Sequence, residues 1–468
     1  MLPKLTLPVL PDDGKKFLYL VRPCPFIFIL LCTMVVYGQP GKPLMRPGAL
    51  PPLMGQHQWM PGANAQQGVK PVLLSSASLL SNTIDYPTED CFTYTYQLQV
   101  GNLTSNESNQ DAFTATSGAT YLVGQTSMNG NGDGLLQKLD EKGIVVWSKT
   151  IGRADRNEVI RSVRELPNGH LILIGTSMLA DGRDKKVFFA ATTQEGAVLW
   201  VKTLNSVSGY RGAGIAVTPY EEVGFVADNE TSVIYGRITE AGNLVWLKKL
   251  QLFENGHAIG ITKYDYNGWF IACTGTEEGR RVGAVIKVEP KDGAVIWFNK
   301  LGGTAVDAEY ILHDMEIINL RPRITGIYAK GGAPFQLFKL TVNTSTMTES
   351  VQTFQLPGVA IDATAQSVIC PLGEVIAFAP TGSSAELYTF KMITEAYPDH
   401  LTTWRRMFSN WQGHKLTAVE RTHDGGYLFL SDKKISAVDN DIYLSKADSA
   451  GLTGSCDPGT DFLLESSF

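Results

Sequence analysis

The 468-residue sequence has no long basic run and little charge overall, with 18% charged side chains and a formal net charge of −6. Proteins that bind nucleic acids neutralise phosphates with clustered lysine and arginine, so no nucleic-acid partner is expected. The sequence also lacks HExxH, G-x-S-x-G and P-loop motifs and any CxxC pair. It therefore carries no signature of a zinc protease, a serine hydrolase, a nucleotide-binding protein or a cysteine zinc site.

Long hydrophobic runs are missing too. The longest begins after Lys15, Lys16 and Arg22 and covers residues 26–37, before the small residues of "GQP". A positive stretch followed by a short apolar core is typical of a secretory signal peptide, which we place at residues 1–38. Twelve residues are too few to span a bilayer, which needs about 20. We expect a secreted or cell-surface protein with no stable membrane span after cleavage; a retained membrane anchor is the alternative.

Residues 39–90 hold clustered prolines and no sustained period of 2 or 3.6. Such composition is typical of a flexible linker.

A repeat fills the rest of the chain. The segments "GIVVW", "GAVLW", "GNLVW" and "GAVIW" end at Trp147, Trp200, Trp246 and Trp297, and Trp404 follows after a double interval. The spacing of about 50 residues is typical of a β-propeller blade. The missing member is expected near residue 350. Within each unit, four short β-rich segments are separated mainly by turn residues, as in a four-stranded blade.

Counting these units predicts an all-β, seven-bladed propeller over residues 91–468. The blocks begin near Ala112, Asn157, Gly212, His257, Ala308, Ile361 and His414. The last block lacks its fourth strand, and an unassigned strand, "CFTYTYQLQV", precedes the first block. We therefore expect this N-terminal strand to complete the last blade and close the ring, leaving no open sheet edge there. The glycine should form the turn before the outer strand, and the tryptophan should pack between blades.

Four cysteines follow the predicted signal peptide. Cys273 and Cys370 lie in apolar strands of different blades and are expected to be buried thiols. Cys91 starts the N-terminal strand, and Cys456 follows the turn where that strand should enter the last blade. Ring closure would bring these two together, so we predict a disulfide between them in an exported chain.

The segments "KLDEKGIVVWSKTIG", "ATTQEGAVLWVKTLN" and "KVEPKDGAVIWFNKLGG" resemble repeats of secreted quinoprotein-alcohol-dehydrogenase-like (PQQ-like) β-propeller proteins of Gram-negative bacteria. The resemblance covers about residues 91–460 and implies a propeller fold. True quinoprotein dehydrogenases have eight blades and an adjacent cysteine pair near the quinone, whereas this sequence predicts seven blades and has no such pair. No cofactor is expected from it.

One loop has the spacing of a calcium site. Asn129, Asn131, Asp133 and Asp140 occupy positions 1, 3, 5 and 12 of "NGNGDGLLQKLD", where an EF-type loop places its oxygen ligands. A plain glycine- and asparagine-rich loop is the alternative interpretation.

Loops between the second and third strands and between consecutive blades differ in length and chemistry, whereas the turns before the outer strands are short and alike. Both variable sets emerge on one face of a propeller, and binding residues concentrate on such loops. We therefore predict a binding rim there. Its residues are Arg153, Asp155, Arg156, Tyr210, Arg211, His257, Asp307, Trp411 and His414.

With no convergent set of ionisable residues visible in the sequence, we expect a non-catalytic binding or scaffold propeller for a protein or glycan at the cell surface. The alternative is an enzyme that uses the central channel, either a quinone-type oxidoreductase or a propeller lyase or hydrolase. The discriminating feature would be a cluster of ionisable side chains in that channel.

Overall fold

The computed structural model describes most of the chain after residue 94. The ranges are residues 54–55, 95–101, 105–127, 132–140, 143–220, 222–250, 252–265, 268–303, 306–318, 321–344, 346–370, 375–392, 402–409, 411–436, 439–453 and 465–467. The predicted signal peptide, Cys91 and Cys456 lie outside them, as does the predicted linker apart from residues 54–55. Where the structure is described it contains no α-helix, and thus no helix able to cross a membrane.

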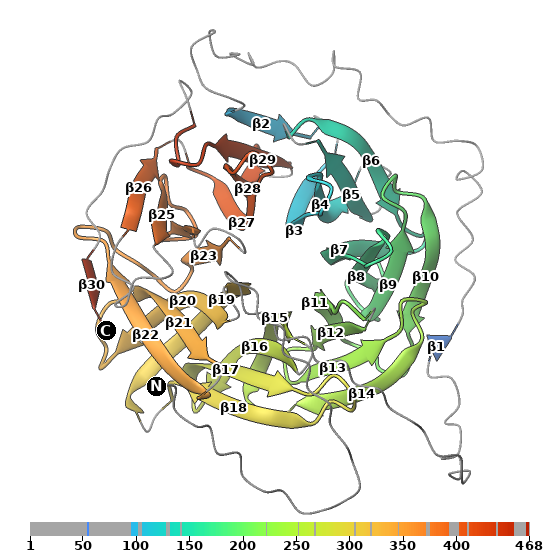
Figure 1. Ribbon diagram of the computed structural model, residues 1–468, viewed down its shortest axis with the longest axis horizontal. Coiled ribbons are helices and arrows are strands. Elements are labelled where there is room, and N and C mark those ends of the chain that lie inside the picture. Colours follow the sequence, from blue (N-terminus) through green and yellow to red (C-terminus); the bar gives the residue numbers. More distant parts are fainter. Residues whose placement is uncertain are drawn as a thin grey trace, which may run out of the picture. The chain divides into compact units, whose positions relative to one another are not determined.

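The described strands form seven antiparallel sheets around a central axis, which confirms the seven-bladed propeller (Figure 1). Each blade runs from an innermost strand A to an outermost strand D. Blade 1 contains β3 (Glu107–Thr114), β4 (Thr120–Thr126), β5 (Asp133–Leu139) and β6 (Val145–Ile151). Blade 2 contains β7 (Asn157–Glu165), β8 (Leu171–Met178), β9 (Lys186–Thr192) and β10 (Val198–Leu204). Blade 3 contains β11 (Arg211–Val217), β12 (Val223–Asp228), β13 (Val233–Ile238) and β14 (Leu244–Leu250).

Blades 4 to 6 follow the same order. Blade 4 contains β15 (Glu254–Asp265), β16 (Gly268–Glu277), β17 (Arg280–Val288) and β18 (Val295–Leu301). Blade 5 contains β19 (Ala308–Ile318), β20 (Arg321–Lys330), β21 (Gln336–Asn343) and β22 (Thr348–Gln355). Blade 6 contains β23 (Gln366–Ile369), β24 (Val375–Ala379), β25 (Leu387–Met392) and β26 (Thr402–Phe408).

Blade 7 joins distant parts of the chain, as predicted. It contains β27 (His414–Arg421), β28 (Tyr427–Lys434), β29 (Asn440–Ala447) and the N-terminal β2 (Tyr96–Val100). The register pairs Tyr96 with Lys446 and Val100 with Ile442. Two further short strands lie on outer edges: β1 (Met54–Gly55) pairs with β10, and β30 (Glu465–Ser467) pairs with β22.

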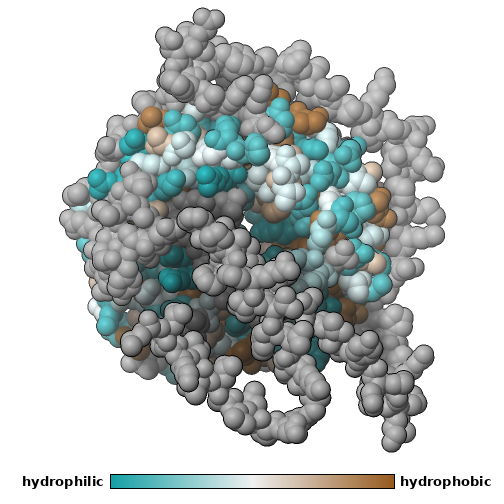
Figure 2. All heavy atoms as spheres, in the orientation of Figure 1, coloured by the Kyte–Doolittle hydropathy of each residue, from teal (hydrophilic) through white to brown (hydrophobic). Residues whose placement is uncertain are grey.

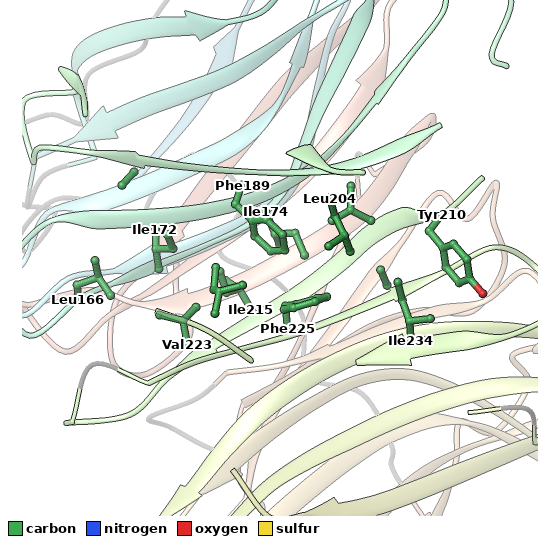
Figure 3. Packing of buried hydrophobic residues seen from close by; sticks show 14 residues of the cluster. Leu166, Ile172, Ile174, Phe189, Leu204, Tyr210, Ile215, Val223, Phe225 and Ile234 are labelled. Atoms are coloured by element: carbon green, nitrogen blue, oxygen red, sulfur yellow. The ribbon is translucent and has the colours of Figure 1, made fainter. Parts of the chain in front are cut away.

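The hydrophobic core lies between blades rather than within one. In the described chain there are seven buried clusters, one at each blade interface. Figure 3 shows the one between blades 2 and 3, where Phe189 meets Phe225 edge-on with ring centroids 4.9 Å apart. The cluster between blades 7 and 1 includes Val100 of β2. Closure of the ring therefore completes a core layer as well as a hydrogen-bond ladder. Cys273 and Cys370 are buried thiols that are not disulfide-bonded, as expected.

In four places the glycine of one blade contacts the tryptophan of the preceding blade across their interface. Gly242 has φ +72° in the turn between β13 and β14, a conformation that glycine adopts without strain. A Cβ there would lie 2.6 Å from the Trp200 ring of the preceding blade. The same contact joins Gly196 to Trp147, Gly293 to Trp246 and Gly451 to Trp404. The repeat thus fixes the spacing between neighbouring blades.

The register also shows what replaces tryptophan in the other blades. Trp147 pairs with Lys138, whose partner in strand B lies three residues before Gly124. Ser350 holds the corresponding position in blade 5, near the predicted residue 350, because its partner Thr341 pairs with the strand B residue three positions before Gly326. Tyr96 holds it in blade 7.

The residue before each of the first four tryptophans is skipped by the ladder in a β-bulge. A bulge re-aims the next side chain, and here it leaves the skipped residue exposed: Val146, Leu199, Val245 and Ile296. Figure 2 shows apolar patches at the margin of the ring and mainly polar residues nearer its axis.

Candidate functional site

The two ends of the ring carry different connections. The rim face carries the loops between blades and those between strands B and C, for example residues 152–156, 179–185, 205–210 and 229–232. The turn face carries the A–B and C–D turns, for example residues 115–119, 166–170, 193–197 and 239–243. The sequence favoured the rim face for binding.

Four of the nine predicted rim residues are buried, which corrects the prediction for them. Arg156, Tyr210, Trp411 and His414 have only 7%, 6%, 3% and 3% of their surface exposed. Tyr210 shares a 2.7 Å hydrogen bond with the Ser232 hydroxyl. These side chains begin at the rim but turn inward between strands.

Arg156 is a structural cation of blade 2. Its Nε donates to the Ser177 hydroxyl at 2.7 Å, and its Nη1 pairs with Asp184 at 2.9 Å. Ser177 in turn donates to the fully buried Glu158 at 2.7 Å. Burial raises the pKa of Glu158 to about 7, although the Ser177 hydrogen bond and the Arg153 N–H oppose the shift. The ion pair with Asp184 and the hydrogen bond to Ser177 offset the cost of burying the Arg156 guanidinium.

Trp411 and His414 form one buried aromatic group. Their rings stack with centroids 4.6 Å apart, and His414 meets Tyr443 edge-on at 4.5 Å. Burial, with help from Lys433, lowers the pKa of His414 to about 3. His414 is therefore neutral at physiological pH and packs as a core aromatic.

The other predicted rim residues, which are exposed or partly exposed, occur in ion pairs. Arg211 of β11 pairs with Asp228 at 2.8 Å and donates to Nδ1 of His257 in the next blade at 2.6 Å. Arg153 pairs with Asp155 at 3.0 Å. Asp307 pairs with Arg280 at 2.5 Å. These groups lie at different blade junctions around the ring, so the described rim offers no single convergent site.

The calcium loop is not formed by its two carboxylates. Asp133 opens β5 and Asp140 follows its end. A strand rises about 3.3 Å per residue, so the two lie about 23 Å apart. Asn129 and Asn131 lie outside the described residues. Among those described, no group of three or more His, Cys, Asp or Glu side chains is arranged to hold a metal ion.

The residues present do not fit a quinone site of the type that the resemblance implies. Its marker is an adjacent cysteine pair. In the described part of the chain Cys273 lies in β16 of blade 4, and Cys370 follows β23 of blade 6.

The strands around the axis carry a charged group that the sequence did not reveal. Arg164 of β7 pairs with Asp111 of β3 at 2.8 Å and lies 3.9 Å from Glu316 of β19. Since β7 belongs to blade 2 and β19 to blade 5, this axial cluster joins blades far apart in the ring. Asp314 and Glu420 also interact with it electrostatically. Its members lie scattered along the chain, so only the ring brings them together.

Burial and mutual repulsion shift the acids of the axial cluster. Burial, with Asp314 and Asp111, raises the pKa of Glu316 to about 8, opposed by Arg164. Burial raises the pKa of Asp314 to about 6 and that of Glu420 well above its ordinary value. Burial alone would lower the pKa of Arg164, but the Asp111 and Glu316 carboxylates raise it.

Backbone amides occupy several of these carboxylates. Asp111 accepts the N–H groups of Ala112 and, in the next blade, Val163. Asp314 accepts those of Met315 and, also in the next blade, Ile369. The two aspartates therefore hold neighbouring blades together at the axis.

A cleft of about 440 Å³ opens on the turn face. Its lining comes from four consecutive blades: Thr116 of blade 1; Glu165, Leu166, Pro167, Asn168, Gly169 and Gln194 of blade 2; Val217, Thr218 and Pro219 of blade 3; and Lys263 of blade 4. The sequence had favoured the other face because these turns are short and alike. Short turns still leave room between neighbouring blades, which no turn sequence shows.

Hydrogen bonds fix the blade 1 and blade 2 side of this cleft. One Glu165 oxygen accepts the Thr116 N–H at 3.0 Å and the Thr116 hydroxyl at 2.9 Å. The other accepts the Gln194 amide at 2.8 Å. Asn168 donates to Glu240 at 3.2 Å. Tyr220, which follows the lining residue Pro219, is 67% exposed. Hydrogen bonds thus fix the polar groups of the cleft wall, and an exposed tyrosine follows the last blade 3 lining residue in the chain.

No protein-family model matches this chain, and no curated protein matches it. Solved structures with similar folds include the α-L-arabinofuranosidase Arb93A from Fusarium graminearum, at 10% identity and a TM-score of 0.43, covering 79% of this chain and 98% of that one. Drosophila Semaphorin 1b matches at 9% identity with a TM-score of 0.44, and the match covers 75% of this chain and 86% of that one. The β-propeller domain of the Trilobed protease from Pyrococcus furiosus matches at 8% identity with a TM-score of 0.41, and the match covers 74% of this chain and 95% of that one. Likenesses this distant say nothing about activity, ligand or partner.

Proposed function

We propose that this chain is a secreted or cell-surface, non-catalytic binding propeller, and that a glycan binds in the cleft of the turn face. The observation that carries the proposal is the polar lining of that cleft, drawn from four blades of a rigid ring. Binding residues held by a rigid scaffold are ordered before the ligand arrives, which lowers the entropic cost of binding.

The chemistry of the lining suits sugar hydroxyls. A hydroxyl both donates and accepts hydrogen bonds, and the cleft offers the amides of Asn168 and Gln194 and the hydroxyl of Thr116. Tyr220 follows the lining residue Pro219 in the chain and exposes an aromatic ring, against which we infer that the apolar face of a sugar ring packs.

The carboxylate of the cleft favours binding over hydrolysis. Glycoside hydrolysis ordinarily uses two carboxyl groups that flank the bond to be cleaved. Glu165 is the one carboxylate among the described lining residues, and it accepts three hydrogen bonds from Thr116 and Gln194. Its oxygens thereby fix the cleft wall.

The test is a glycan array followed by titration calorimetry on the wild-type protein and on Tyr220→Ala and Asn168→Ala. We expect each substitution to weaken glycan binding about tenfold, which corresponds to about 1.4 kcal/mol. Because both side chains are exposed, the free energy of unfolding should change by no more than about 1 kcal/mol.

Arg153→Ala is the matched control, since it removes a partly exposed polar side chain on the rim face. It should leave glycan binding unchanged. Loss of binding in Arg153→Ala with retention in Tyr220→Ala would place the ligand on the rim face instead. Absence of any bound glycan, with capture of a protein partner sensitive to Arg153→Ala, would replace this proposal by a protein-binding rim.

The axial cluster favours a second candidate function, a hydrolase or lyase acting at the ring axis. A protonated Glu316 beside Arg164 has the raised pKa of a general acid. Incubation with polysaccharides should then release reducing ends or unsaturated sugars, and Glu316→Gln should abolish the release. Product formation that is unchanged in Glu316→Gln would exclude this role.

A further inference from the structure

Lys263 differs from the other lining residues of the cleft. It lies near the end of β15 in blade 4 and is half-buried. Burial lowers the pKa of its ammonium, and no charged neighbour contributes to that shift. Among the described residues none forms a hydrogen bond or ion pair with it.

Other buried or partly buried lysines of the same ring have partners. Lys446 of blade 7 pairs with Asp424 at 2.5 Å. Lys202 of blade 2 donates to the Ala241 carbonyl at 2.6 Å and to the Asn243 side chain at 2.8 Å. Removing an ammonium from water without such a partner costs stability. Partial burial of the Lys263 ammonium therefore costs free energy that no contact among the described residues offsets.

An anion from outside the chain would offset it. Glu165, the lining carboxylate, lies in blade 2, whereas Lys263 lies in blade 4 with the Val217, Thr218 and Pro219 wall of blade 3 between them. The oxygens of Glu165 are already used by Thr116 and Gln194. The cleft thus has a neutral hydrogen-bonding side formed by blades 1 and 2 and a cationic side formed by blade 4.

We propose that the ligand of this cleft is an anionic saccharide whose carboxylate or sulfate group is bound by Lys263. This inference rests on the proposed glycan-binding function. The sugar hydroxyls face Asn168 and Gln194, and the anionic substituent faces blade 4. A charge-assisted hydrogen bond to an ammonium is roughly twice as strong as a neutral one, so Lys263 sets the preference between charged and neutral sugars.

The experiment compares matched probes by calorimetry: an oligogalacturonate and its methyl ester, and a sulfated galactan oligosaccharide and its desulfated form. At least one anionic probe should bind at least tenfold more tightly than its neutral counterpart, and the stronger pair identifies carboxylate or sulfate as the group recognised. Lys263→Gln should abolish that preference, and added salt should weaken binding of the anionic probe. Lys248→Gln, which removes an exposed lysine of β14, should leave both probes unaffected.

Thermal melting separates a binding role from a structural one. Because the ammonium has no partner among the described residues, Lys263→Gln should melt at the same temperature as the wild-type protein or higher. A lower melting temperature would show that Lys263 holds the fold together and would overturn the assignment.

Failure of this inference is distinguishable from failure of the proposed function. Equal binding of charged and neutral sugars, lost in Tyr220→Ala but retained in Lys263→Gln, would overturn the anionic preference and leave glycan binding intact. Binding of neither probe set and of no array glycan would overturn both.

Discussion

Replacing Gly242 by alanine should destabilise the propeller at the interface between blades 2 and 3. Gly242 has φ +72° and lies against the ring of Trp200. The substitution forces an L-residue into the left-handed region, which costs about 1–2 kcal/mol. Its Cβ would also lie 2.6 Å from the Trp200 ring and 3.1 Å from Lys202 Cδ, and overpacking of this kind costs about 1–3 kcal/mol. The free energy of unfolding should therefore fall by about 2–5 kcal/mol.

Gly182 supplies the matched control. It has φ +79°, no atom within 4 Å of its would-be Cβ, and the same turn hydrogen bonds, since Gly182 N donates to Leu179 O as Gly242 N donates to Thr239 O. Gly182→Ala should cost about 1–2 kcal/mol, because only the backbone term remains.

Urea unfolding followed by tryptophan fluorescence measures both variants. In a Trp200→Leu background the ring is gone, so Gly242→Ala should cost no more than Gly182→Ala does. Equal costs for the two glycines in the wild-type background would refute the interpretation that the glycine–tryptophan contact sets the blade spacing.

Three further predictions follow from the closed ring and its axis. The pKa of Glu316 is raised to about 8, so the folded protein holds that proton more tightly than the unfolded chain. Its contribution to stability is complete below the ordinary carboxyl pKa and disappears as pH rises through 8; urea unfolding from pH 5 to 9 should show this fall, and Glu316→Gln should flatten it. Deleting Tyr96–Val100 exposes the edge of β29 and should cause aggregation on size-exclusion chromatography; a monomer with unchanged melting would contradict this. Non-reducing peptide mapping of exported protein should join Cys91 to Cys456 and leave Cys273 free, whereas a Cys273–Cys370 pair would contradict the predicted closure.

Much of the fold could be predicted because the repeat is a local pattern. A turn glycine and a tryptophan recur about every 50 residues and mark the outer strands of blades 1 to 4. The unassigned strand before the first block and the incomplete last block together predicted closure by β2, which the Tyr96–Lys446 register confirms. Even the gap in the pattern had a structural counterpart, because Ser350 holds the tryptophan position in blade 5.

The candidate site was less predictable because burial and convergence are properties of the ring. Arg156 and Trp411 lie in variable loops, where exposure was expected. Hydrogen bonds and an ion pair to Ser177 and Asp184 hold Arg156 in a buried position. The ring of Trp411 is buried against His414. The turns of the opposite face look uniform in sequence, yet a cleft lies among them.

The sequence by itself determined the blade count, the closure, the turn glycines and the packing of the tryptophans between blades, because each follows from a short motif or from a regular count of units. Only the tertiary structure showed that these glycines contact the tryptophan of the preceding blade. Only the tertiary structure decided which apolar residues reach solvent, since the bulges that expose Val146 and Leu199 follow from strand register. It also assembled the axial cluster, where Arg164 meets Asp111 and Glu316 from blades 1 and 5. Side chains separated by more than a hundred residues interact there because ring closure directs the innermost strands toward one axis, a long-range constraint that no local pattern encodes.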